Sequence, residues 1–404
     1  MKILIINTFY EGTSTGKIAT GLYKKLKENG HECKVLYGAD EENDNSDFIK
    51  IATEFDIRLA WIHNQISGIH GNFAPFVMKR VYKIIQDFRP DIVQLYNLHY
   101  YYINMYQLFD YLKKRNIPTV YGMLDEYPYL GYCCYAYDCT QYLDGCKKCN
   151  YKRFRREYPR NLFRNGVKKT VALKEKAYAD YNKLVFTAPK WVVSRAEKSY
   201  LLKGKCIKIV DEYIDTNNTF VPRKTEALKE ELGIAPNKFI ALNVAPSNDA
   251  RKGVKYYLEL AERFKGENYV FVHVGYQGET SGLPDNVIPI PFVKNQVRLA
   301  EYYSMADVFI CTSLADTMPN VCLDALACGT PVLGFNITGV PYVASAPLGH
   351  FVEAGNVNAL EEQVRLSERK TQDMIRECRE YAVRRYSPET YYEKMMFIYK
   401  ELIR

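Results

Sequence analysis

Two acidic residues in the stretch ADTMPNVCLDALACGTPVLGFN, residues 315–336, stand where they could contact a phosphorylated, hydroxyl-rich ligand. Asp316 and Asp324 flank a Met-Pro-Asn segment, and a helix is expected to begin there, near Pro319 or Asn320. The free N–H groups and positive dipole end of such a helix start bind anions and suit a diphosphate. Carboxylates accept paired hydrogen bonds from vicinal hydroxyls, so one acid could hold a sugar and the other a ribose. The alternative is that both acids only cap the helix.

A second candidate segment, NVAPSNDARKGVKYYLELA, carries two adjacent cations. Arg251 and Lys252 directly precede Gly253 and a predicted helix, at the end of a predicted strand. Two cations in that place suit phosphate oxygens. An ordinary basic loop is the alternative for this segment taken alone. Both segments are expected on one surface, where the strands end, and this coincidence indicates a binding site more strongly than either segment does.

The elements that must position these residues alternate between strand and helix, with a polar segment between two series. Such alternation predicts parallel sheets covered on both faces, an α/β architecture. Ligands then bind at the C-terminal strand ends, here facing a cleft between two doubly wound, Rossmann-like domains. We expect domains at residues 1–215 and 216–386, with a final helix at about 387–404 packing back on the first. The predicted strands are KILIINTF, ECKVLYG, DIVQLYN, IPTVYGM, KLVFTAP and CIKIVDE, then FIALNVAP, YVFVHVG, NVIPIPF, DVFICTS and PVLGFN.

A cysteine-rich loop interrupts the first series. Cys133, Cys139, Cys146 and Cys149 follow the spacing C-x5-C-x6-C-x2-C, and four thiols in a reduced compartment can form a tetrahedral structural zinc site. Such a site would hold together a loop that has no secondary structure of its own. Packed free thiols or a disulfide are the alternatives. No His-rich or acidic cluster in the sequence suggests a catalytic metal.

The formal net charge of +8 is concentrated in residues 151–176, which hold ten Lys or Arg interleaved with aromatic residues. Contact with an anionic membrane or acceptor is one interpretation, and a solvated helical face is the other. Nucleic acid is not an expected partner, because no nucleic-acid-binding motif accompanies the charge. The N-terminus reads as a first strand and no stretch is long and apolar enough to span a bilayer, so we expect a cytoplasmic protein, peripheral at the inner face of the plasma membrane.

The segment YYSMADVFICTSLADTMPNVCLDALACGTPVLGFNITGVP resembles the retaining glycosyltransferases of family 4, which have the GT-B fold, and the resemblance extends over nearly the whole chain. That family has an E-x7-E pattern where this chain has Asp316 and Asp324, each one methylene shorter. The resemblance implies that Asp316 contacts the donor sugar and Asp324 the ribose diol. It also implies that backbone N–H groups at Asn320 and Val321 contact the diphosphate.

Further matches extend this resemblance. Arg251 and Lys252 match the family's cationic pair, which neutralises the departing nucleoside diphosphate. The backbone of Phe292 to Lys294 falls where the family contacts the base. In GTSTGKIATGLYKKLKENGH, Gly16 and Lys17 match the glycine-containing first turn.

The stretches QLYNLHYYYIN and YGMLDEYPYLGYC resemble acceptor-side loops of a subgroup that makes capsule and exopolysaccharide and shares the cysteine spacing. They hold His99 and Asp125, the polar candidates for catalysis together with Asp316. Two residues depart from the family pattern: Leu124 stands where the subgroup usually has a histidine, and Tyr342 where a glutamate is common.

The resemblance implies a retaining glycosyltransferase that needs no cofactor for catalysis and acts in bacterial surface polysaccharide synthesis. A UDP-sugar is the expected donor, and a glycan or polyprenyl-linked glycan is the expected acceptor. The departures at Leu124 and in the shortened acids leave an alternative open, a catalytically impaired homologue that binds another glycosyltransferase.

Overall fold

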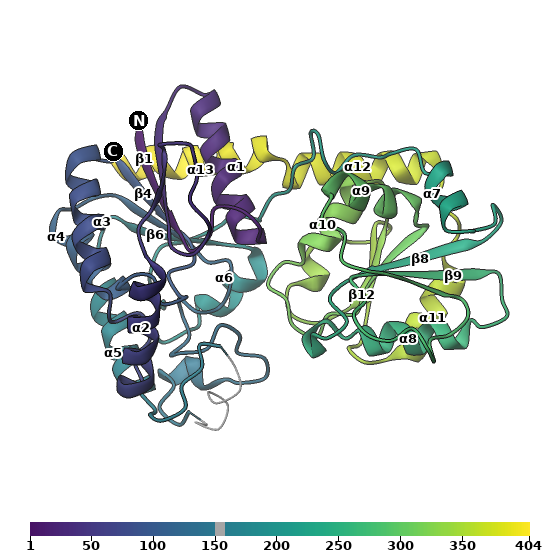
Figure 1. Ribbon diagram of the computed structural model, residues 1–404, viewed down its shortest axis with the longest axis horizontal. Helices are drawn as coiled ribbons and strands as arrows, with labels where there is room; N and C mark the ends of the chain where they lie inside the picture. The colour runs from purple at the N-terminus through teal and green to yellow at the C-terminus, as the bar shows by residue number, and fades with distance from the viewer. Residues whose placement is uncertain (150–157) are drawn as a thin grey trace. The chain divides into compact units, whose positions relative to one another are not determined.

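The computed structural model describes residues 1–149 and 158–404, so part of the predicted basic stretch lies outside the described residues. The chain divides into two compact units, Met1–Val210 with Tyr391–Arg404, and Asp211–Thr390 (Figure 1). The predicted boundary lay between residues 215 and 216. Each unit contains one parallel sheet between helices, so the α/β class is confirmed and both sheets are of the Rossmann-like type.

The sheet of the first unit has seven strands in the order β3-β2-β1-β4-β5-β6-β7, and every neighbouring pair is parallel. The strands at its centre, β1, β4 and β5, are buried on both sides because helices cover both faces of a parallel sheet. All strands predicted for this unit are present, and β3 was not predicted. Their bounds are β1 Lys2–Asn7, β2 Glu32–Tyr37, β3 Phe48–Lys50, β4 Ile92–Leu95, β5 Thr119–Gly122, β6 Leu184–Ala188 and β7 Ile207–Ile209.

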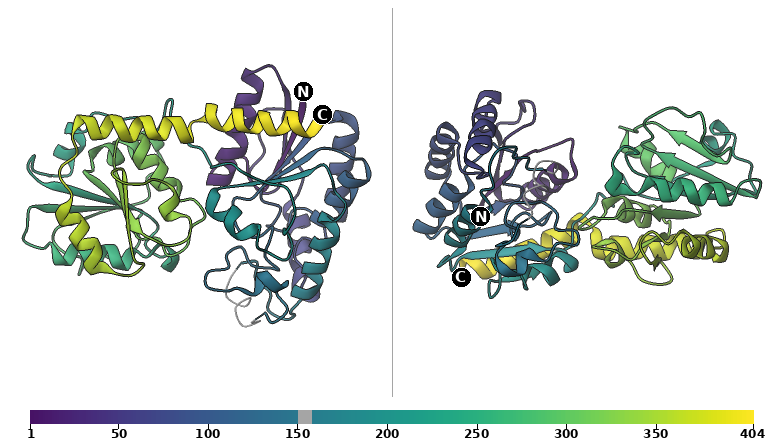
Figure 2. Two further views of the ribbon diagram at one scale, coloured as in Figure 1. Left: turned by 180° about the vertical axis from the view of Figure 1, so that it is seen from behind. Right: turned by 90° about the horizontal axis from the view of Figure 1, so that it is seen from below.

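The helices of the first unit connect these strands and pack against the sheet, as Figure 2 shows from two further sides. The chain returns at its C-terminus to this unit, where Tyr391 bonds Tyr96 through their hydroxyls at 2.7 Å and Tyr399 donates to Gln94 at 2.9 Å. The helices are α1 Ser14–Glu28, α2 Glu54–Ser67, α3 Pro75–Phe88, α4 Met105–Lys114, α5 Val167–Tyr178, α6 Lys190–Ala196 and the short η1 Gln141–Asp144. The last helix, α13 Pro388–Ile403, belongs to this unit from Tyr391 onward.

The sheet of the second unit has six parallel strands in the order β10-β9-β8-β11-β12-β13. Successive residues of β8 alternate between two cores: Phe239 and Ala241 pack on one face, Ile240 and Leu242 on the other. The strands are β8 Phe239–Val244, β9 Tyr269–Val274, β10 Val287–Ile290, β11 Val308–Cys311, β12 Val332–Phe335 and β13 Gly349–Val352.

The helices of the second unit form two groups, which match the two cores. Helices α8 and α11 form one group, and helices α9, α10 and α12 form the other. None of the helices that the structure describes is long and apolar enough to cross a bilayer. The helices are α7 Glu226–Glu231, α8 Val254–Arg263, α9 Gln296–Met305, α10 Asn320–Ala327, α11 Val357–Leu366 and α12 Gln372–Tyr386, with the short η3 Ala250–Lys252 and η4 Val340–Tyr342.

Candidate functional site

The candidate binding residues of the second unit lie in loops that follow neighbouring parallel strands. The loop after β8 carries Arg251 and Lys252, and the loop after β11 carries Asp316. Strands β8 and β11 are direct neighbours in the sheet. Because parallel strands end at the same edge, side chains far apart in the sequence meet there, as expected for ligand sites in such folds.

Lys252 and Asp316 form the central polar contact of this edge. The Lys252 Nζ donates to Asp316 Oδ2 at 2.7 Å, and both side chains are largely buried. Burial by itself lowers the pKa of Lys252, but attraction to Asp316 and the hydrogen bond between them outweigh burial, so the pKa is raised. Lys252 is therefore a firmly protonated cation held at the strand ends. The predicted sugar-binding acid and a predicted phosphate-binding cation are direct partners.

Local structure explains how the two cations are presented. Asp249 caps η3 by accepting from the Arg251 backbone N–H at 3.0 Å, and its other oxygen accepts from the Arg251 guanidinium at 3.0 Å. Gly253 then has φ +63°, and a Cβ there would lie 2.1 Å from the carbonyl oxygen of Thr312. Glycine is required at this position for both reasons, because only glycine accepts this φ freely and only glycine fits against β11's end.

Helix α10 begins at Asn320, as the sequence predicts, and the preceding Pro319 provides no side-chain cap. The N–H groups of Asn320 and Val321 belong to its first turn, which leaves a positive helix end. Asp324 lies one turn further on, and its side chain is buried. Burial first, and then the nearby Asp324 carboxylate, raise the pKa of Tyr303.

Two backbone hydrogen bonds of Asp316 hold its loop in place. The Asp316 N–H donates to Thr338 Oγ1 at 3.0 Å, and its carbonyl accepts from the Gly339 N–H at 2.8 Å. These bonds tie the loop after β11 to the loop after β12. Phe292, the predicted base-binding position, is exposed in the loop after β10, and Tyr342 is exposed in η4.

In the first unit, the structure brings His99 and Asp125 together. His99 follows β4, Asp125 follows β5, and these strands are neighbours. The His99 Nε2 lies 2.7 Å from Asp125 Oδ2, and Asp125 Oδ1 accepts from the Tyr127 N–H at 2.9 Å. The hydroxyl of Thr8, at the end of β1, donates to the His99 carbonyl at 3.1 Å. Three adjacent strand ends therefore hold this pair.

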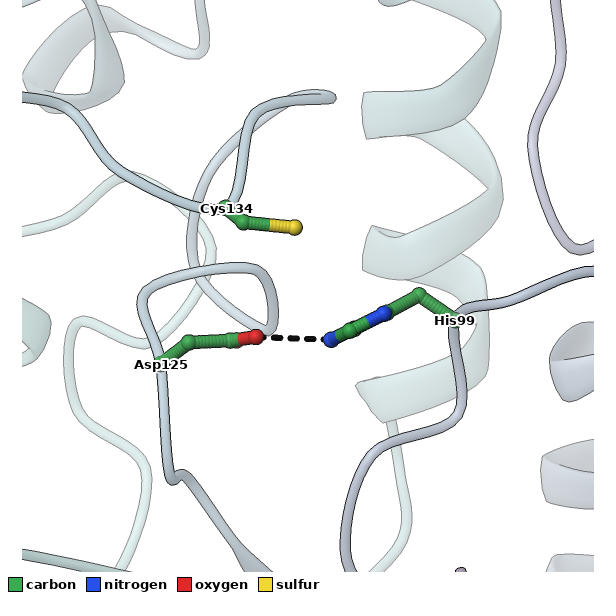
Figure 3. A group of neighbouring side chains, drawn as sticks. All are labelled: His99, Asp125 and Cys134. Atoms are coloured by element: carbon green, nitrogen blue, oxygen red, sulfur yellow. Dashed lines mark hydrogen bonds and ion pairs between the residues drawn. The ribbon is translucent and has the colours of Figure 1, made fainter. Parts of the chain in front are cut away.

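A third side chain, which the sequence did not single out, completes this cluster. Figure 3 shows Cys134 beside the His99–Asp125 hydrogen bond, and the potential ligand atoms of the three residues lie within 4.8 Å of one another. Imidazole, carboxylate and thiolate can together hold a divalent transition metal. Burial raises the pKa of the Cys134 thiol, and the Asp125 charge raises it further, so without a metal this thiol is protonated.

A buried lysine lies behind the same loop. Lys174 belongs to the predicted basic stretch but is fully buried on α5, where its Nζ donates to the carbonyl oxygens of Tyr127 and Leu130. Burial lowers its pKa to about 7, against the opposing effect of nearby Cys134 and other groups. Lys174 is therefore part of the core that supports the loop after β5, not part of a basic surface.

The remaining predicted positions of the first unit, Gly16 and Lys17, lie near the end of β1. Gly16 is in the first turn of α1, where Thr13 caps its N–H at 3.1 Å, and a Cβ at Gly16 would lie 2.8 Å from the Glu11 nitrogen. Lys17 is exposed beside it, and Leu124 is half-buried just before Asp125.

The four cysteines Cys133, Cys139, Cys146 and Cys149 are free thiols that all line one small cavity. Within the part of the chain that the structure describes, no three of these sulfur atoms lie within 4.8 Å of one another. The loop therefore gathers the thiols without drawing them into tetrahedral contact.

Comparison with known proteins agrees with this arrangement. Two parallel α/β units of this kind define the GT-B class of folds. Residues 224–385, which include the Lys252–Asp316 pair and the start of α10, match the family model of glycosyl transferases group 1. The similarity to this family therefore concerns residues 224–385 of the chain.

Individual relatives are more distant. The chain is 27% identical to alpha-maltose-1-phosphate synthase of Mycobacterium tuberculosis over 184 residues, 41% of this chain and 47% of the relative. It thus spans about half the length of the curated relatives it matches. Among solved structures, sucrose-phosphate synthase from Thermosynechococcus elongatus superposes with TM-score 0.70 at 14% identity, covering 99% of this chain and 98% of the other.

The Anabaena protein HepE in complex with UDP and glucose superposes with TM-score 0.65 at 14% identity, covering 99% of this chain and 100% of the other. At these identities the likeness concerns the fold.

Sequence reasoning missed three residues that shape the two sites: Asp249, Thr338 and Cys134. Asp249 could have been found from the sequence, because Asp is a typical N-cap residue and Asp249 directly precedes the short helix η3 that carries Arg251. Thr338 and Cys134 were not, since their importance depends on which loops the sheet brings side by side.

Proposed function

We propose that this chain is a glycosyltransferase that moves a sugar from a UDP-sugar to a glycan or lipid-linked glycan acceptor in surface polysaccharide synthesis. The observation that carries the proposal is the Lys252–Asp316 pair at the strand ends of the second unit, together with a second cation, Arg251, and the uncapped start of α10. Cations and free N–H groups recognise a diphosphate, and a carboxylate recognises sugar hydroxyls.

The proposed roles divide along this edge. Lys252, Arg251 and the N–H groups of Asn320 and Val321 stabilise the charge that develops on the departing nucleoside diphosphate, which is the principal contribution to catalysis. Asp316 accepts hydrogen bonds from the sugar. This division needs no cofactor for the transfer itself. UDP is the proposed nucleotide because the similar Anabaena structure holds UDP and glucose.

The buried Asp324 is proposed to hold the ribose diol, and the backbone of Phe292 to Lys294 to contact the base. In the first unit, we propose that the His99–Asp125 pair contacts the acceptor or the sugar, and that Gly16 and Lys17 approach the ligand at the first turn. Retention of anomeric configuration is proposed from the family resemblance. A purely binding homologue is not proposed, because the matched relatives carry the names of synthases.

The test compares nucleotide binding by three variants in calorimetric titrations with UDP, GDP and ADP. Lys252→Met should weaken UDP binding about 10- to 100-fold, the effect of losing a charged hydrogen bond. Lys255→Met is the matched control, because Lys255 is exposed on α8 three residues later, and it should change binding less than about twofold. Thermal unfolding of each variant shows that the fold is retained.

Asp316→Asn distinguishes the contribution of the sugar to binding from that of the phosphates. This variant keeps the Lys252 side chain but removes the carboxylate charge that raises its pKa, so the diagnostic result is a larger loss of affinity for the UDP-sugar than for UDP. Absence of binding by every nucleotide, or equal binding by wild type and Lys252→Met, would remove the proposed donor site. With an active pair of substrates, NMR of the product's anomeric proton decides between retention and inversion.

We also propose a structural zinc ion in the cavity lined by Cys133, Cys139, Cys146 and Cys149, since four thiols in one cavity suit zinc. Binding would draw the sulfur atoms closer together. Elemental analysis of protein purified without chelators should find about one zinc per chain, reduced in Cys139→Ser but retained in Cys206→Ser, which alters an exposed cysteine outside the loop. A wild-type protein that is purified without zinc and whose stability does not change when zinc is added would contradict the proposal.

A further inference from the structure

Helix α2 buries several polar side chains and exposes several large apolar ones, unlike an ordinary surface helix. Its buried residues are Asp56, Ala60, Asn64 and Gln65, and Ile57 packs partly buried against the core. Its outward face carries large apolar side chains with high exposed fractions. These are Phe55 at 64%, Trp61 at 44%, Ile62 at 40% and Ile66 at 63%. A surface helix normally turns its apolar stripe to the core, so this arrangement needs a physical explanation.

Specific polar contacts lock the helix in this orientation. Asp56 is paired with Arg80 at 2.8 Å and also completes a capping box at the helix start. Asn64 accepts from the Tyr132 hydroxyl at 2.9 Å. Rotating the helix to bury its apolar face would expose or break these contacts, each of which satisfies a buried polar group. The apolar face therefore stays outward.

The segment after the undescribed residues extends this face. Gln65 donates to the Arg160 carbonyl at 2.8 Å and accepts from the Leu162 N–H at 3.0 Å. The end of α2 also lies against Gly166. Leu162 and Phe163 are 46% and 72% exposed. They therefore lie side by side with the C-terminal half of α2, which Figure 1 shows in front of α5.

We name the α2 face as the set of exposed side chains Phe55, Trp61, Ile62, Ile66, Leu162 and Phe163. The same elements carry several exposed cations, whereas their exposed acids are Glu54 on α2 and Glu175 on α5. An apolar face with basic flanks is complementary to an anionic bilayer, in which apolar side chains enter the acyl boundary and cations meet headgroups. The exposed cations on the same elements are Arg58, Arg160, Arg164, Lys168 and Lys169.

We propose that the α2 face docks on anionic phospholipid, with α2 lying in the plane of the membrane surface. The basic stretch alone suggested headgroup contact; the structure adds apolar insertion by a helix that precedes it in the chain. Tryptophan at 44% exposure suits the interfacial layer, where an amphipathic ring is most stable. Lipid binding by this face does not depend on the proposed nucleotide site.

The first experiment uses Trp61 as its own reporter. The chain has two tryptophans, so Trp191→Phe leaves Trp61 as the sole emitter. Vesicles of phosphatidylglycerol and phosphatidylcholine should shift Trp61 emission to the blue, and brominated acyl chains should quench it. Vesicles of phosphatidylcholine alone should bind at least about tenfold more weakly, and added salt should weaken binding to the anionic vesicles. Unchanged emission in anionic vesicles would overturn the proposal.

The second experiment compares matched exposed positions by vesicle co-sedimentation of the full chain. Ile66→Ser and Phe163→Ser should each lower the partition coefficient about tenfold or more, because each removes an inserted apolar side chain. Phe397→Ser is the control, since Phe397 is 62% exposed on α13, outside the α2 face, and it should leave partitioning unchanged. All three should retain the wild-type Tm.

Equal loss in the control and in the α2-face variants would overturn the proposal. So would a wild-type chain that ignores vesicles but forms dimers which Ile66→Ser disrupts, because the face would then contact a second copy. Unaltered nucleotide binding by Ile66→Ser shows that any loss of lipid binding is separate from the donor site.

Discussion

Gly253→Ala tests whether close packing against β11 holds the cationic loop in place. Gly253 has φ +63°, and an added Cβ would lie 2.1 Å from the Thr312 carbonyl oxygen. The matched control is Gly266→Ala, because Gly266 has φ +78° with nothing within 4 Å of an added Cβ. Both substitutions place alanine in the left-handed region, and only the first creates a clash.

The expected losses of stability follow from these geometries. Alanine in the left-handed region costs about 1 kcal/mol in each variant. At Gly253 the contact must also lengthen from 2.1 Å to about 3.4 Å, which separates the loop from the strand end. That movement strains two hydrogen bonds, Leu314 N–H to the Arg251 carbonyl at 2.8 Å and the Thr312 hydroxyl to the Lys252 carbonyl at 3.1 Å. At about 1 kcal/mol each, they bring the total to about 3 kcal/mol.

Thermal and urea unfolding followed by circular dichroism measure the difference. For a unit of this size, the Tm should fall by about 6–12 °C in Gly253→Ala and about 2–4 °C in Gly266→Ala. Calorimetry with UDP should show weaker binding only in Gly253→Ala, since only that variant displaces Lys252. Equal losses of Tm in the two variants would contradict the close contact between Gly253 and Thr312. Unchanged UDP affinity in a destabilised Gly253→Ala would show that the loop does not contribute to nucleotide binding.

Three further predictions test other contacts. Gly339→Ala should lose about 2 kcal/mol in urea unfolding, because a Cβ would lie 1.8 Å from the Thr317 carbonyl oxygen at an unstrained φ of −78°; wild-type stability would contradict this packing. Lys174 has a pKa of about 7 in the folded chain against 10.5 as its ordinary value, so between these pH values the unfolded chain binds more protons. The free energy of unfolding of the wild type should therefore rise relative to that of Lys174→Met by up to about 1.4 kcal/mol per pH unit from pH 7 upward. Parallel curves of unfolding free energy against pH for the two proteins would contradict a buried lysine with a lowered pKa. Arg195→Met leaves the buried Glu126 without its ion-pair partner at 2.9 Å and should cost about 3 kcal/mol, whereas adding Glu126→Gln should recover part of the loss; strictly additive effects in the double-mutant cycle would contradict the pairing.

The sequence was informative about the elements whose burial pattern is simple. Every predicted strand of both series is present, because strands of a parallel sheet are continuous apolar runs bounded by polar turns. The short strands β3 and β13 were not predicted. Neither was α2, since its buried positions include Asp56, Asn64 and Gln65 and its exposed positions include Trp61, so no stripe of apolar residues marks a core-facing side.

The candidate residues were predictable as a set, but their partners were not. Sequence order places Lys252 and Asp316 after separate strands, and only the neighbouring position of β8 and β11 makes them an ion pair. In the same way, nothing local marks Cys134 as the neighbour of His99 and Asp125, or separates the buried Lys174 from the exposed cations around it in the chain.

The sequence by itself determined the α/β class, most strands, the start of α10 at Asn320 and the residue types available at the strand ends. These follow from local rules of burial, capping and turn chemistry, which act over a few residues. Tertiary structure decided the strand order, and with it which charges neutralise one another, which thiols share a cavity and which face of α2 meets solvent. Those outcomes depend on contacts between distant segments, and a local pattern of residue types carries no information about them.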